Sequence, residues 1–191
     1  VSQVPAAWSM TPTVGIGASA GARAAEDGKT ESVEDMLLRK EASRAMGVDE
    51  EVFDDDVRLV EQAYHWESKY EARKPRYFNR VHTGYEWNRY NQTHYDANNP
   101  PPKVVQGYKF HIFYPDLIDP FKAPTYRVQP DPDGPGETVL LRFSAGPPYE
   151  DVAFRIVQRE WDYSFKRGFR SSFDRGILQL HCTCTYREKR L

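Results

Sequence analysis

One stretch of this sequence combines the side chains that bind nucleic acids and proteins. Residues 73–95 interleave cations, amides and aromatic rings. Cations contact phosphates and aromatic rings stack on bases, as in single-stranded nucleic-acid sites. Tyr, Trp and Arg also carry most of the binding energy at protein interfaces. The residues that we predict to contact a protein or RNA partner are Arg73, Lys74, Arg76, Tyr77, Asn79, Arg80, Tyr85, Trp87, Asn88, Arg89 and Tyr90.

The same stretch also fits a purely structural role. Aromatic side chains can hold a long segment against a β-domain, and Arg side chains can stack on them through cation–π contacts. The sequence therefore leaves three alternatives open for residues 73–95. They pack inside their own domain, form an interface with another protein, or contact RNA directly.

The other reactive residues of the sequence do not form a recognisable metal, cofactor or catalytic site. His181-Cys-Thr-Cys184 resembles a zinc ligand set, but structural zinc sites usually separate paired cysteines by two residues or more, and here the gap is one. We interpret Cys182 and Cys184 as small buried hydrophobes. Gly15–Gly21 lacks the βαβ context of a dinucleotide loop. We predict no metal, no cofactor, no catalytic residue and no small-molecule substrate, and therefore a protein that is not an enzyme.

Charge divides the chain into two regions. The net charge is −2, yet acidic residues dominate between Glu31 and Glu61 and basic residues are in excess from Arg73 onward. Such blocks indicate an acidic arm that stays solvated or docks on a basic surface. No apolar run reaches the roughly 20 residues that span a bilayer. We expect no membrane contact, and two cysteines placed badly for a mutual disulfide favour a reducing intracellular compartment.

The pattern predicts one helix and several strands. Ser32 and Asp35 form a plausible capping box for a helix over about 32–46, with Gly47 as its end. Its apolar stripe leaves two options: it docks on another molecule or packs on its own domain. Alternation predicts strands over 104–114, 126–129 and 138–144, and favours a strand over a helix for 151–164.

The last segment predicts a β-hairpin. Residues 168–173 and 177–187 flank a turn at 174–176, where Gly176 supplies a positive φ. One face of the second strand carries Leu178, Leu180, Cys182, Cys184 and Tyr186. We therefore predict a mainly β fold: a compact antiparallel β-domain over 63–191, preceded by an extended, partly helical acidic arm over 1–62.

Several long strings resemble the C-terminal domain of the cactin family. The strongest runs from Arg73 to Asn88 and reads Arg-Lys-Pro-Arg-Tyr-Phe-Asn-Arg-Val-His-Thr-Gly-Tyr-Glu-Trp-Asn. Similar strings follow at 90–95, 99–103, 105–110, 113–119 and 145–151. The resemblance covers about residues 64–187.

The resemblance implies a nuclear, non-enzymatic pre-mRNA splicing factor. It implies a scaffold or bridging subunit of the catalytic or post-catalytic spliceosome. Its partners would be spliceosomal proteins, with phosphate contacts to pre-mRNA or snRNA as a further class. The alternative that the family offers is an adaptor that binds an ankyrin-type inhibitor in Rel/NF-κB-like signalling. No catalytic residues come with the family.

Overall fold

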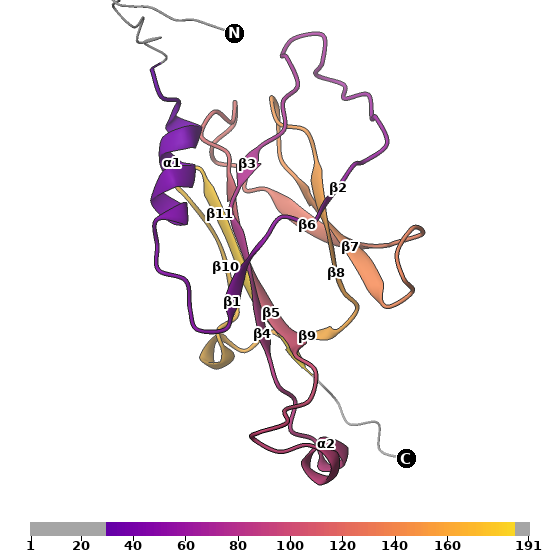
Figure 1. Cartoon of the computed structure of the whole chain (residues 1–191). Coiled ribbons are helices and arrows are strands. Elements are labelled where there is room, and N and C mark those ends of the chain that lie inside the picture. The colour runs from indigo at the N-terminus through magenta and orange to yellow at the C-terminus, as the bar shows by residue number, and fades with distance from the viewer. Residues whose placement is uncertain (1–29, 186–191) are drawn as a thin grey trace, which may run out of the picture. The chain divides into compact units, whose positions relative to one another are not determined.

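Two antiparallel β-sheets stack face to face in the computed structural model, which describes residues 30–185. Sheet A has seven strands and sheet B has four. Helix α1 lies on the side of sheet A that faces away from sheet B (Figure 1). The predicted mainly β, antiparallel fold class is confirmed. No helix within the described residues is long and apolar enough to cross a membrane.

The strand order draws on distant parts of the chain. Sheet A contains, in spatial order, β1 (Glu50–Phe53), β4 (Asn79–Gly84), β5 (Val104–Phe113), β11 (Ile177–Thr185) and β10 (Arg170–Asp174), with β3 (Arg76–Tyr77) also paired to β5 and β9 (Glu160–Asp162) to β11. Sheet B contains β2 (Asp56–Val57), β8 (Val152–Val157), β7 (Thr138–Ser144) and β6 (Thr125–Pro130). The helices are α1 (Val33–Ala42), α2 (Arg89–His94) and the 3-10 turn η1 (Phe165–Arg167).

The core lies between the two sheets. Strand β5 confirms the strand predicted over 104–114. Its alternation turns Tyr108, Phe110 and Ile112 inward, and all three are buried. The ring of Phe110 lies 5.4 Å from that of Phe143 in β7 and 5.5 Å from that of Phe154 in β8. Large aromatic side chains therefore join sheet A to sheet B.

The ambiguous segment 151–164 forms strands, which confirms the preference for a strand over a helix. Val152, Phe154 and Ile156 of β8 face the core with a period of two, and β9 follows after a short break. In a helix, Phe154 would have pointed away from the face that carries Val152 and Ile156. The chain changes from sheet B to sheet A at this break.

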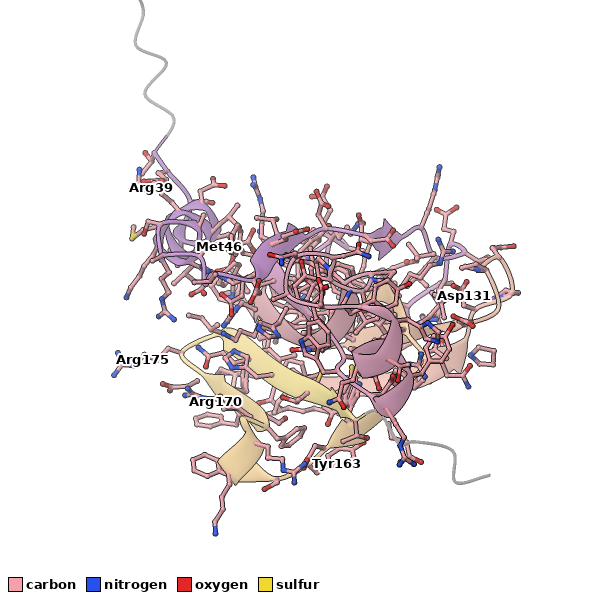
Figure 2. The ribbon with its side chains drawn as sticks, turned by 60° about the horizontal axis from the view of Figure 1, so that its bottom comes forward. Arg39, Met46, Asp131, Tyr163, Arg170 and Arg175 are labelled. Atoms are coloured by element: carbon pink, nitrogen blue, oxygen red, sulfur yellow. The ribbon has the colours of Figure 1, made fainter. Side chains whose placement is uncertain are left out.

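The predicted C-terminal hairpin is confirmed over its described residues. Strands β10 and β11 pair around a two-residue turn in which Arg175 and Gly176 have φ values of 52° and 77°. This geometry matches the twist of the strands. A Cβ atom on Gly176 would lie 3.0 Å from the Cα of Pro115, so the position also requires a small residue. Arg175 points away from the sheet at the end of the hairpin (Figure 2). Tyr186, assigned to the same core face as Cys184, lies outside the described residues.

The predicted helix is shorter than expected. It begins after Ser32, whose Oγ accepts a hydrogen bond from the Asp35 backbone N–H, as the predicted cap requires. It ends at Ala42 rather than near Gly47. The Ser43 hydroxyl donates to the Lys40 carbonyl, a local bond that competes with helix continuation.

Part of the predicted arm belongs to the sheets. We placed residues 1–62 outside the β-domain, whereas the compact unit starts at Glu31. Strand β1 pairs with β4 and forms one edge of sheet A, and β2 pairs with β8 and forms one edge of sheet B. The short, acidic strands carry little alternation, so the sequence pattern did not reveal their pairing. The residues before 30 lie outside the described part of the chain.

The packing of Phe110 generates a stability prediction. We expect Phe110→Ala to lower the free energy of unfolding by about 3–5 kcal/mol, because it removes a fully buried ring from the contact between the sheets. Denaturant unfolding of the variant would measure this. The matched control is Phe121→Ala, where the side chain is 97% exposed and the change should stay within about 0.5 kcal/mol. Equal losses in the two variants would contradict this core assignment.

Candidate functional site

The acidic segment, defined as residues 31–57, neutralises the first half of the predicted site. In each pair, a carboxylate of this segment contacts a basic side chain of residues 73–109. The pairs are Glu34 with Arg73 at 3.2 Å, Asp35 with Arg76 at 2.9 Å, Asp49 with Lys103 at 3.6 Å, Asp56 with Lys74, and Glu50 with Lys109. The arm that charge patterning predicted to dock on a basic surface does so within its own chain.

Arg80 is the most buried of the Lys and Arg residues that contact the acidic segment. Its side chain is only 5% exposed, and its guanidinium donates to the carbonyls of Glu41, Arg44 and Ala45 at 3.0–3.3 Å. These carbonyls lie at and beyond the end of α1, where helix geometry leaves acceptors without partners. The positive charge of Arg80 also lies near the negative end of the α1 helix dipole, which is a favourable position for a cation. Arg80 thus fixes the chain that leaves α1.

Two carboxylates and one ring complete the surroundings of Arg80. Glu41 Oε1 and Glu50 Oε2 lie 3.9 and 3.8 Å from the guanidinium, and the Phe78 ring centroid lies 5.3 Å from it. A hydrogen bond from Lys109 is the main cause of a lowered pKa of Glu50. The charge of Arg80 is therefore buried but compensated on several sides.

A second contact connects α1 to the end of sheet B. The hydroxyl of the fully buried Tyr149 donates to Glu34 Oε1 at 2.9 Å and accepts from the Asp116 backbone N–H at 3.0 Å. The Arg73 guanidinium lies 5.0 Å from the Tyr149 ring centroid. Burial, as the largest cause, raises the pKa of Tyr149 well above its usual value. The inward side of α1 therefore carries Glu34 and Glu41 beside the half-buried Leu37 and Leu38, while Val33 and Met36 are more than half exposed.

Two further residues of the predicted site also belong to the interior. The Tyr77 ring lies 4.8 Å from that of Phe154 and packs against the core. Asn79 is 1% exposed, and its Oδ1 accepts a hydrogen bond from the His111 backbone N–H at 3.2 Å. Together with Arg80, they hold β3 and β4 against β5. Their packing role was one of the three alternatives open for residues 73–95.

The second half of the predicted site forms a separate surface. We call residues 85–95 the aromatic tip; it contains α2 and lies beyond the ends of β4 and β5 (Figure 1). Tyr85, Trp87 and Tyr90 are 38%, 43% and 68% exposed. All three side chains keep a substantial exposed fraction, and that of Tyr90 is the largest. The structure therefore separates the predicted site residues into an internal group and an exposed group.

Local polar contacts give the aromatic tip its shape. Asn88 caps α2, since its side chain accepts from the Asn91 backbone N–H at 2.8 Å, and Asn91 Nδ2 donates to the Glu86 carbonyl at 2.6 Å. The Tyr90 and His94 rings lie in contact, with centroids 4.3 Å apart and planes tilted by 47°. Helix α2 was not predicted from the sequence. The signal that could have indicated its start is Asn88, a favoured N-cap residue, three positions before Asn91.

The charges around the aromatic tip balance. Arg89 and Lys103 are offset by Glu86 and Asp96, and Lys103 lies 5.8 Å above the Tyr85 ring. A surface that binds a phosphate backbone needs an excess of cations. Exposed Tyr and Trp with balanced charge are typical of a protein interface. Contact with a partner at Tyr85, Trp87, Asn88, Arg89 and Tyr90 stays a prediction.

The cysteines and histidines of β11 lie on opposite faces. Cys182 and Cys184 are buried in the core without a disulfide, and burial raises the pKa of their thiols to about 12 and about 11. His181 lies on the outer face, where its Nε2 is 3.1 Å from Nε2 of His111. No group of three His, Cys, Asp or Glu within residues 30–185 could hold a metal ion.

The fold and this surface describe a class of protein: an antiparallel β-sandwich with an internal ion-pair network and an exposed aromatic loop. The family model described as the Cactus-binding C-terminus of cactin protein matches residues 66–190. The match covers most of the chain, and the chain belongs to the cactin family. The predicted resemblance to this family is confirmed.

Curated relatives carry one name across distant organisms. The chain is 59% identical over 162 residues to Splicing factor Cactin of Arabidopsis thaliana, covering 82% of this chain and 22% of the relative. It is 58% identical over 151 residues to that of Homo sapiens, covering 79% and 20%. For Schizosaccharomyces pombe the identity is 53% over 119 residues, covering 57% and 23%. The chain thus spans about a fifth of the length of these relatives.

The histidine pair generates a pH prediction. Burial is the main cause that lowers the pKa of both His111 and His181 to about 4, below the ordinary value of 6.5. The unfolded chain therefore binds protons first as the pH falls. Stability should be complete above about pH 6.5 and should decline towards pH 4, by about 1.4 kcal/mol per pH unit for each histidine.

Unfolding free energies measured between pH 7 and pH 4 would test this slope. His181→Asn should make the slope shallower, because one of the two titrating groups is lost. His65→Asn changes an exposed histidine and serves as the control that should leave the slope unchanged. A slope that His181→Asn does not alter would show that this pair does not control the acid sensitivity.

Proposed function

We propose that this chain serves as part of a non-enzymatic pre-mRNA splicing factor in the nucleus. In this role it is a bridging or scaffold subunit of the catalytic or post-catalytic spliceosome. The observation that carries the proposal is 51–59% identity to relatives from plants, animals and a protozoan that are all named Splicing factor Cactin. The described residues add a rigid sandwich that can present a contact surface without a catalytic centre.

The aromatic tip is the surface that we assign to spliceosomal proteins. It carries three exposed aromatic side chains, and two of them, Tyr85 and Trp87, have ring centroids 6.3 Å apart. Exposed aromatic groups of this kind are typical anchors at interfaces. The basic residues that could hold RNA phosphates, Arg73, Lys74 and Arg76, are already paired with the acidic segment. Protein contact is therefore favoured over RNA contact at residues 73–95.

A second function draws on the description of the family model. That description names a Cactus-binding C-terminus, and the matched region is the one present here. The corresponding activity for this chain would be an adaptor for an ankyrin-type inhibitor in Rel/NF-κB-like signalling. The aromatic tip and the β-sandwich would serve such a partner by the same physical means, so the two functions differ in partner rather than in mechanism.

Purification of spliceosomes with the tagged full chain tests both functions. We expect spliceosomal proteins to co-purify and to crosslink to the aromatic tip. Trp87→Ala combined with Tyr90→Ala should lower this association about tenfold or more, because each removes an exposed interface anchor. Phe121→Ala is the control, since Phe121 is exposed but lies outside the tip.

The remaining outcomes distinguish the candidates. Absence of spliceosomal proteins from the purified material would contradict the splicing proposal, and binding of an ankyrin-type inhibitor at micromolar concentration would then support the adaptor. Crosslinks from the tip to RNA instead of protein would contradict the assignment of this surface to protein partners. The double variant should unfold at the same denaturant concentration as the unaltered chain, because its two side chains are exposed.

A further inference from the structure

The edge of sheet B formed by β6 is open. Strand β6 pairs with β7 over all six residues from Thr125 to Pro130, and it is the last strand of its sheet among the described residues. Its second edge therefore presents backbone N–H and C=O groups to the solvent. Sheet edges of this kind are templates for another strand unless they are protected.

The usual protections are weak on β6. Natural edges carry inward-pointing charges, lysines, bulges or proline. The register with β7 places Tyr126 and Val128 on the inward face of β6, and both are uncharged. Arg127 is the one charged residue of β6 and lies on the opposite face, and proline occurs only at the end of the strand. Tyr126 packs against Phe143 and Trp161, whereas Val128 is 57% exposed. An apolar side chain thus remains uncovered on the core side of an open edge.

A partly open cavity of about 350 Å³ adjoins Val128. Its lining is mainly apolar and includes Val128, Val139, Ile156, Val157, Trp161 and Tyr163. The volume lies at the small end of ligand pockets, which span roughly 300–1,000 Å³. It is suited to one large apolar side chain. Charged residues of both signs, Arg159 and Glu160, lie at the cavity, so it offers no excess charge to an anion.

The edge is held in place before any partner arrives. Asp131, the residue after β6, bonds to Arg155 of β8 at 2.6 Å and accepts from the Thr138 hydroxyl at 2.8 Å. These contacts fix the end of β6 to its own sheet. Because a preorganised edge loses little conformational entropy on binding, it favours strand addition.

We propose that β6 and this cavity bind an extended segment of a partner protein as a further strand of sheet B, with one large apolar or aromatic side chain of that segment in the cavity. The backbone hydrogen bonds would provide affinity and the cavity would provide specificity, as in other cases of β-augmentation. This surface is distinct from the aromatic tip, and the inference does not depend on the splicing function.

A random peptide library displayed on phage provides the probe. We expect the full chain to select peptides with an apolar residue at alternate positions. When a selected peptide binds, the amides of residues 125–129 that do not bond to β7 should gain protection from hydrogen exchange. Val128→Lys should weaken binding about tenfold or more, because it places a charge on the core side of the edge. Phe121→Lys is the matched control and should leave the affinity unchanged.

Several results would overturn the proposal. They are the absence of any selected peptide, equal binding of a selected peptide by the Val128→Lys variant, or protection confined to other strands. If the β6 amides that face away from β7 are already protected in the isolated monomer, the edge is covered by the chain itself. A dimer that Val128→Lys dissociates would assign the edge to a second copy. Since Val128 is more than half exposed, unchanged thermal unfolding of Val128→Lys should show that the variant folds.

Discussion

The buried guanidinium of Arg80 is the contact on which the rest of the arrangement depends. It donates hydrogen bonds to three backbone carbonyls at the end of α1. It also lies within 4 Å of the carboxylates of Glu41 in α1 and Glu50 in β1. Removal of one partner from a buried ion pair typically costs about 3–5 kcal/mol, because the other charge stays desolvated. A single side chain of β4 thus secures two elements that precede it by thirty residues or more.

This network separates the two halves of a sequence stretch that looks uniform. Arg73, Lys74 and Arg76 are satisfied by acidic residues of their own chain, so their charge serves cohesion. The aromatic tip receives no such cover, and Trp87 and Tyr90 remain exposed. Ion pairs at exposed positions contribute little one by one, about 0–1 kcal/mol, but Arg80 gives the network a buried centre. Internal ion pairs and exposed aromatic side chains therefore occupy adjacent parts of one continuous segment.

Sequence patterns predicted the parts of the fold that depend on local rules. Alternation placed Phe110 and Leu180 in the core, and Gly176 marked the hairpin turn, because strand period and backbone sterics act over a few residues. The end of α1 was predicted four to five residues too late, since a contact from Arg80 decides the path there. The site residues were predicted as one surface. Which of them are internal depends on contacts between residues far apart in the chain, and charge blocks alone indicate only that some pairing exists.

Hydrogen exchange of α1 in an Arg80→Lys variant is the most direct test of this dependence. A lysine keeps the charge but cannot present a planar fork to three carbonyls. Loss of protection in residues 33–46, with β5 and β11 still protected, is the result that the role of Arg80 predicts. Protection of α1 equal to that of the unaltered chain would contradict it, and the attachment of the acidic segment would then have to come from the exposed ion pairs and Tyr149.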